Sequence, residues 1–85
     1  MYGIDVSEKL SKKIEKFPKK DLKNITDKIE KLSEDPRPRW SEKLTNRDSY
    51  RISIGDYRVL YAVNDDRKQV IVHAIGHRKD IYKKP

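Results

Sequence analysis

Three apolar segments in the second half of the chain are separated by corners of only a few residues. They cover residues 50–54, 57–63 and 69–75. In the first two, apolar side chains alternate with others, which is the two-residue period of a β-strand. The first corner is a Gly-Asp dipeptide and the second begins with Asn-Asp-Asp, compositions typical of tight turns. Strands joined so closely must run antiparallel, so the segments predict a three-stranded antiparallel meander.

The first 36 residues contain one short strand pattern and two helix patterns. Residues 2–6 alternate as a first strand, and Ser7 can cap a helix that Pro18 closes. Asp21 can cap a second helix, whose apolar side chains share one face and which ends at Pro36. We expect these helices to form a hairpin packed on one face of a single sheet that includes the first strand and the meander. The predicted fold class is therefore α+β.

The whole chain, residues 1–85, is expected to form one domain. Residues 37–48 show no periodicity and are interpreted as a loop that Trp40 and Leu44 attach to the core. The longest apolar run covers only residues 59–63, far less than a membrane span, and the N-terminus lacks the apolar run of a signal peptide. These features predict a cytoplasmic protein without a membrane partner.

The basic residues change type along the chain. Residues 1–36 contain lysine but no arginine, whereas every arginine lies in residues 37–85. The formal net charge is +7, and the excess is concentrated in this second part. Arginine presents a planar fork that matches phosphate oxygens, so the part that contains the meander suits a polyanion. With no cysteine and two histidines, the sequence predicts no metal site and no cofactor.

Alternation places two arginines on one face of the meander. Arg51 and Ser53 lie opposite the apolar residues of the first strand, and Arg58 lies opposite those of the second. The apolar set, which includes Tyr57 and Tyr61, should pack on the helices and leave the arginines on an open basic face. For any single arginine, solvation or pairing with an acid such as Asp56 is the simpler interpretation.

Three further residues follow the third strand closely. His77 and Arg78 end that strand, and Tyr82 comes soon after, so we expect them beside the open face. Histidine can transfer a proton near neutral pH, arginine can stabilise transition-state charge, and tyrosine can stack on a base. Together they suit metal-independent phosphoryl chemistry on RNA. The simpler alternatives are a surface imidazole for His77 and a C-terminal anchor for Tyr82, and His73 is expected to be partly buried.

The segments YRISIGDYRVLYAV and VIVHAIGHRKDIY resemble the RelE/ParE superfamily of type II toxins, and more narrowly RelE. The element order extends this resemblance over nearly the whole chain. It implies an mRNA interferase that enters the ribosomal A site, where the 2′-hydroxyl attacks the adjacent phosphate. It also implies a cognate RelB-like antitoxin that wraps the toxin and contacts operator DNA.

The resemblance implies roles for individual residues. Arg58 matches the arginine that contacts the scissile phosphate, and Arg78 matches the arginine that stabilises charge or assists the leaving group. Tyr82 matches the C-terminal tyrosine that stacks on the substrate base. These three residues are the main catalytic candidates.

Two positions differ from the family pattern. Arg51 stands where some relatives have a lysine that binds phosphate or acts as base, and Ser53 stands where they have a second lysine. The missing lysine leaves the general base open, and His77 is the candidate for proton transfer. Arg51 and Ser53 are assigned to substrate binding.

Two other functions remain open. A ParE-type toxin would inhibit DNA gyrase by binding, and the shared GDYRVLY motif is compatible with it. A basic module that binds RNA without cutting it would also fit the serine at position 53. The basic second part also predicts that an acidic segment of the antitoxin covers the open face or displaces the region of Tyr82.

Overall fold

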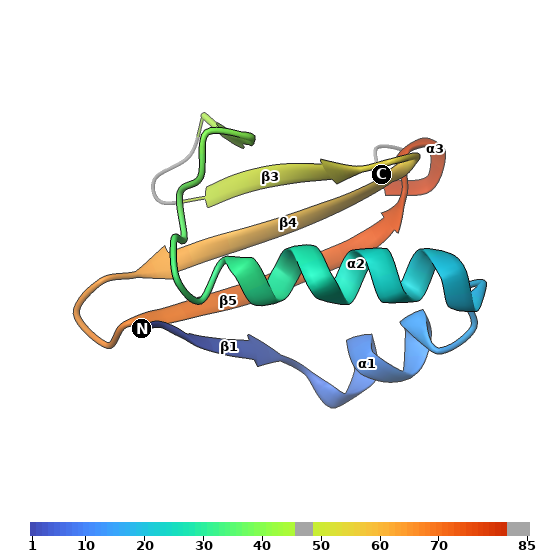
Figure 1. Ribbon diagram of the computed structural model, residues 1–85, viewed down its shortest axis with the longest axis horizontal. Coiled ribbons are helices and arrows are strands. Elements are labelled where there is room, and N and C mark those ends of the chain that lie inside the picture. The colour runs from blue at the N-terminus through green and yellow to red at the C-terminus, as the bar shows by residue number, and fades with distance from the viewer. Residues whose placement is uncertain (46–48, 82–85) are drawn as a thin grey trace.

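The computed structural model describes residues 1–45 and 49–81, which form a five-stranded sheet with two of their three helices on one side (Figure 1). The strand order is β1-β5-β4-β3-β2; β1 runs parallel to β5, and the other neighbours are antiparallel. The α+β class and the β3-β4-β5 meander are therefore confirmed. The elements are β1 (Gly3–Val6), α1 (Glu8–Ile14), α2 (Lys19–Lys31), β2 (Ser41–Lys43), β3 (Ser49–Ile54), β4 (Tyr57–Asn64), β5 (Gln69–His77) and α3 (Arg78–Ile81).

The core lies between α1, α2 and one face of the sheet. Helix α1 begins at Ser7, whose Oγ accepts a hydrogen bond from the Leu10 amide at 3.1 Å, as the sequence predicts. Spacing of three to four residues turns the apolar side chains of both helices toward the sheet. The buried residues are Leu10, Ile14, Ile25, Ile29, Leu32, Tyr50, Ile52, Ile54, Val59, Tyr61, Val63, Val70, Val72 and Ile75.

Tyr61 lies at the centre of this core with no exposed surface. Its hydroxyl donates to the carbonyl oxygen of Pro36 at 2.8 Å, which satisfies its polar atom inside the core. Burial raises the pKa of Tyr61 to about 12. The ring of Tyr50 stacks on it at 5.7 Å, while Tyr57 packs at the edge of the same core. The prediction that Tyr57 and Tyr61 are core residues is confirmed.

The helix ends differ from the sequence prediction. Helix α1 ends at Ile14, before Pro18, and Pro18 is the N-cap of α2. Asp21 is not the cap; it lies in the first turn, where a carboxylate favours the positive end of the helix. Helix α2 ends at Lys31, well before Pro36. Each helix therefore ends several residues before the proline that the sequence suggested as its end.

The predicted loop over residues 37–48 contains a strand. Residues Ser41–Lys43 form β2 on the edge of the sheet, although none of them is apolar; residues 46–48 lie outside the described residues. Pairing with β3 supplies the hydrogen bonds that this sequence pattern does not indicate. The prediction for Trp40 is wrong, because it is 40% exposed and lies under the Lys28 ammonium at 4.7 Å from the ring centre. Leu44 is half-buried.

A cluster of polar side chains joins four separate parts of the chain. The Arg37 guanidinium donates to both Asp65 carboxylate oxygens, at 3.2 and 2.8 Å, and to the Tyr50 hydroxyl at 2.8 Å. The Tyr2 hydroxyl donates to Asp65 at 2.6 Å. Asp65 therefore connects β1, the segment after α2, β3 and the corner between β4 and β5.

The hydrogen bonds to Asp65 predict an acid-sensitive contribution to stability. Bonds from Arg37, and then from Tyr2, hold the pKa of Asp65 below its ordinary value. Such a group stabilises the fold above its unfolded pKa of about 4, and this contribution is lost as the pH falls through the lower folded pKa. Asp65→Asn should lower the free energy of unfolding at pH 7 and weaken its decline below pH 4. Urea denaturation at several pH values measures both effects; an unchanged decline would contradict the prediction.

Candidate functional site

The sheet face opposite α1 and α2, called the helix-free face here, carries three of the predicted site residues. Arg51 and Ser53 lie on it from β3, and Arg58 lies beside Ser53 as its cross-strand partner on β4. Their neighbours Ile52 and Val59 are buried on the opposite side. Both arginines are half-buried and Ser53 is exposed. The predicted grouping of these side chains on one face is confirmed.

The two arginines differ in their partners. Arg51 forms an ion pair with Glu42 of the neighbouring strand β2. Arg58 instead donates from Nη1 to the carbonyl oxygens of Gly55 and Tyr57, both at 3.0 Å. Within residues 1–45 and 49–81, no carboxylate lies within ion-pair distance of Arg58. Neutral acceptors orient the guanidinium of Arg58 and leave its positive charge uncompensated.

Helix α3 follows β5 directly and lies at the end of the sheet where β3 and β4 are joined (Figure 1). Gly76 is the cross-strand partner of Arg58, and a Cβ at this position would lie 3.9 Å from the Cβ of Ile81. The side chain of Ile81 therefore covers Gly76. Arg78 is anchored to the β3–β4 turn, because its amide donates to the Asp56 carbonyl at 2.7 Å and its Nε lies 3.8 Å from the Asp56 carboxylate.

His77 does not lie beside Arg58, although the sequence suggested that it would. It pairs with Tyr57, and its ring meets the Tyr57 ring edge-on at 5.8 Å, on the side of the sheet that the helices cover. The reason is a bulge in β5: Leu60 pairs with Ala74 and Tyr61 with Val72, so His73 has no partner on β4. The extra residue reverses the faces of all later residues in β5.

The same bulge explains a second wrong expectation. His73 is exposed, whereas the sequence pattern suggested a partly buried histidine. An unpaired bulge residue points away from the ladder, so the flanking isoleucines do not cover it. Tyr82 lies outside the described residues, and its predicted role stays a prediction.

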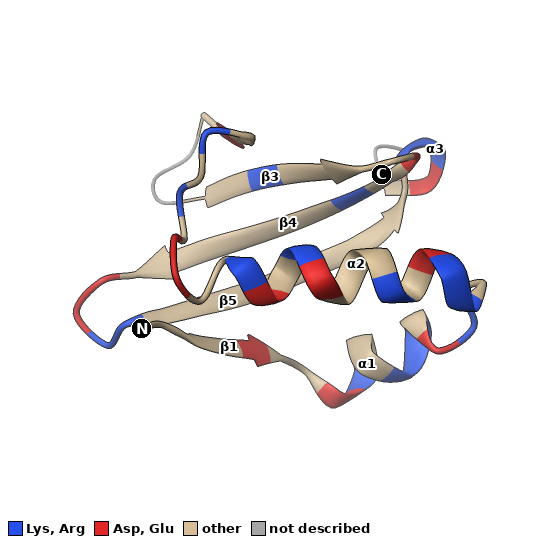
Figure 2. Ribbon diagram, in the orientation of Figure 1, with Lys and Arg blue, Asp and Glu red and all other residues tan. Residues whose placement is uncertain are grey.

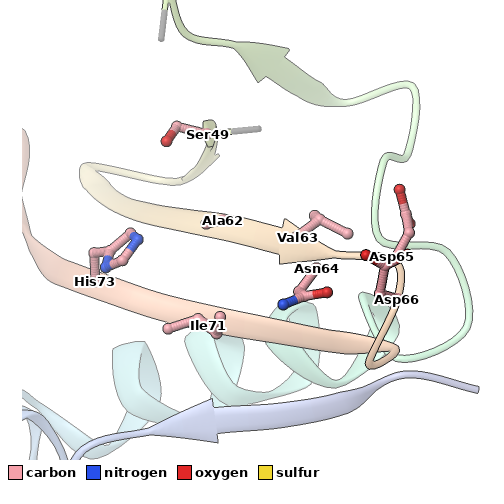
Figure 3. A pocket seen from close by; sticks show the side chains of 8 residues that line it. All are labelled: Ser49, Ala62, Val63, Asn64, Asp65, Asp66, Ile71 and His73. Carbon is pink, nitrogen blue, oxygen red and sulfur yellow. The ribbon is translucent and has the colours of Figure 1, made fainter. Parts of the chain in front are cut away.

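A hollow of about 570 Å³ lies at the far end of the helix-free face, and the sequence did not indicate it (Figure 3). It opens beside the β4–β5 corner, and Asp65 and Asp66 of that corner line it. Figure 2 shows blue segments on β3 and β4, and red and blue residues together in the β4–β5 corner. The lining residues are Ser49, Ala62, Val63, Asn64, Asp65, Asp66, Ile71 and His73.

Clusters of metal-ligating side chains and helices that could cross a membrane are both absent from the described part of the chain. In residues 1–45 and 49–81, no three His, Cys, Asp or Glu side chains gather as ligands for a metal ion. In the same residues, no helix is both long enough and apolar enough to cross a membrane.

The comparisons with known proteins show which class of small proteins shares this fold and this sequence. Residues 5–82 match the sequence model of the ParE toxins of type II toxin-antitoxin systems. The chain therefore belongs to the RelE/ParE toxin superfamily, as its sequence resemblance implied.

The individual relatives are RelE proteins. RelE1 of Methanocaldococcus jannaschii is 30% identical over an alignment that covers 99% of this chain and 98% of RelE1. The isolated RelE toxin of E. coli has a TM-score of 0.80 at 26% identity, covering 96% of this chain and 92% of the other. RelE in the archaeal RelE–RelB complex of Pyrococcus horikoshii has a TM-score of 0.78 at 26% identity, covering 93% and 97%.

The contacts of Arg58 predict that it can be replaced without unfolding the protein. Arg58→Ala removes hydrogen bonds to two carbonyl groups at a partly exposed position, which should cost about 1 kcal/mol or less. Thermal denaturation should therefore show a fall in Tm of no more than about 8 °C. A larger loss would mean that Arg58 is mainly a structural residue.

Proposed function

We propose that this protein is a RelE-type toxin that cuts mRNA in the ribosomal A site. The observation that carries the proposal is Arg58: it lies on the helix-free face, is oriented by two carbonyl oxygens, and is opposed by no carboxylate among the described residues. An oriented cation without a counterion is suited to a scissile phosphate.

The proposed reaction is an internal transfer at one phosphate. The 2′-oxygen loses its proton and attacks the adjacent phosphorus, while the bond from phosphorus to the 5′-oxygen breaks and the 5′-oxygen gains a proton. The products are a 2′,3′-cyclic phosphate and a 5′-hydroxyl. Arg58 and Arg78 would stabilise the added negative charge, a role that needs no metal ion, and Tyr82 would stack on the base next to the cut.

The remaining residues of the face would bind rather than react. Arg51 would contact a flanking phosphate in exchange for its partner Glu42, and Ser53 would donate a hydrogen bond beside Arg58. A residue with the basic character of lysine is absent at position 53. The group that removes the 2′-proton therefore stays unassigned on this face.

The proposed partners follow the same similarity. RelE is crystallised with RelB in complexes from Pyrococcus horikoshii and E. coli. We infer a RelB-like antitoxin for this chain, with an acidic segment over the arginines and a separate part that contacts operator DNA. The site of action would be the cytoplasm, where ribosomes translate mRNA.

A ParE-type inhibitor of DNA gyrase is the second candidate. The match to the ParE family model over residues 5–82 favours it. Such a protein would act by binding, without a reaction at phosphate. A supercoiling assay separates the two functions, because a RelE-type toxin leaves gyrase active.

The catalytic proposal predicts that the arginines are needed for cleavage. Toxin treated with EDTA is added to ribosomes programmed with an mRNA, after magnesium has been restored to keep the ribosomes intact. The wild type should cut the A-site codon, whereas Arg58→Ala or Arg78→Ala should lower the rate at least about a hundredfold, because each removes charge stabilisation. Primer extension locates and quantifies the cut.

A matched control distinguishes local charge from total charge. Arg67→Ala removes one arginine from the exposed β4–β5 corner, far from Arg58, and should cut normally. Equal losses in Arg67→Ala and Arg58→Ala would show that only net charge matters. No cleavage by wild type, together with inhibited supercoiling, would favour the gyrase function.

Antitoxin binding should depend on salt. An acidic segment over Arg51 and Arg58 gains part of its affinity from charge, which salt screens. We expect the Kd of the toxin–antitoxin pair to rise when NaCl increases from 50 to 500 mM, and to rise less for Arg51→Ala. Isothermal titration calorimetry measures this difference. An affinity independent of salt would exclude an electrostatic contribution.

A further inference from the structure

Among the described residues, the ring of His77 contacts the start of α3 and the ring of Tyr57 on the helix-covered side. Its Nδ1 accepts a hydrogen bond from the Lys79 amide at 3.2 Å, inside the first turn of α3. Its ring stands edge-on against Tyr57, which is itself 4.9 Å from Phe17 between ring centres. The ring is therefore fixed by packing on one side and by α3 on the other.

The hydrogen bond determines which nitrogen of His77 carries the proton. A ring nitrogen that accepts an N–H bond uses its lone pair, so in the neutral ring the proton is on Nε2. No lone pair is then free to take a proton from a 2′-hydroxyl. A second hollow, of about 400 Å³, lies on the helix-covered side, where His77 lines it together with Asp21, Asn24 and Asp56.

We propose that His77 is a positioning residue that holds α3, and through it Arg78, at the end of the helix-free face, and that it transfers no proton. This inference rests on the proposed ribonuclease function. The hydrogen bond joins the ring of His77 to the amide of Lys79, and Arg78 is the residue between them in the sequence. Loss of the bond releases one of the contacts that hold α3; the contact of Arg78 with Asp56 and the packing of Ile81 over Gly76 remain.

Two substitutions at position 77 separate positioning from proton transfer. The side-chain oxygen of asparagine can accept the Lys79 N–H as Nδ1 does, but asparagine cannot transfer a proton. His77→Ala should lower the single-turnover rate of A-site cleavage about tenfold, whereas His77→Asn should stay within about threefold of wild type and keep the shape of its pH–rate profile. Lys79→Ala is the matched control, because it keeps the backbone amide and should cut normally.

A double substitution tests whether His77 acts through Arg78. If it does, adding His77→Ala to Arg78→Ala should slow cleavage by less than about twofold further. Full additivity of the two losses would overturn the proposal. So would an equal loss of a hundredfold or more in His77→Asn and His77→Ala, because that pattern is typical of a general acid or base.

A measurement that does not depend on mRNA cleavage tests the role of His77 separately from the proposed function. Amide hydrogen exchange followed by NMR should show Lys79 protected in wild type and in His77→Asn, and exchanging at least about tenfold faster in His77→Ala. If the wild type does not cut mRNA, the ribonuclease function fails and exchange alone decides the role of His77. An unprotected Lys79 amide in wild type would overturn the positioning role.

Discussion

The pairing of β4 with β3 on one side and β5 on the other holds the candidate site together. This register places Ser53 and Gly76 on either side of Arg58. Val59 and Tyr61 of the same strand are fully buried, so a shift by one residue would exchange core side chains for charged ones. The position of Arg58 is therefore secured by burial of its neighbours in the sequence, and its own hydrogen bonds only orient the guanidinium.

The bulge at His73 is the second constraint, and it acts on everything that follows in the chain. Because β5 contains one residue more than β4 requires there, Ile75 turns into the core and Gly76 turns to the helix-free face. Ile81 lies over Gly76 at this point, so α3 lies at the end of the sheet that also carries Arg58. The same reversal carries the ring of His77 to the helix-covered side and so separates it from Arg51 and Arg58.

Charge is distributed unequally along the helix-free face. Arg58 keeps its charge uncompensated within the described residues, whereas Arg51 shares its charge with Glu42. The opposite end of the face carries Asp65 and Asp66, one of which is already engaged by Arg37. Arg67 and Lys68 follow these carboxylates in the same corner and balance their formal charge, whereas Arg58 has no counterion among the described residues.

Alternation and helical spacing determined the fold class, the meander, the core faces and the common face of Arg51 and Arg58, because these follow from local periodicity in the sequence. The edge strand β2, the bulge and the two exposed residues Trp40 and His73 depended on tertiary structure. A strand of three polar residues forms because β3 offers a free edge for pairing. A bulge forms where the pairing of two strands must shift by one residue so that apolar side chains on both sides of it face the core. Sequence could therefore name His77, but only the packing of β5 could decide which face it occupies.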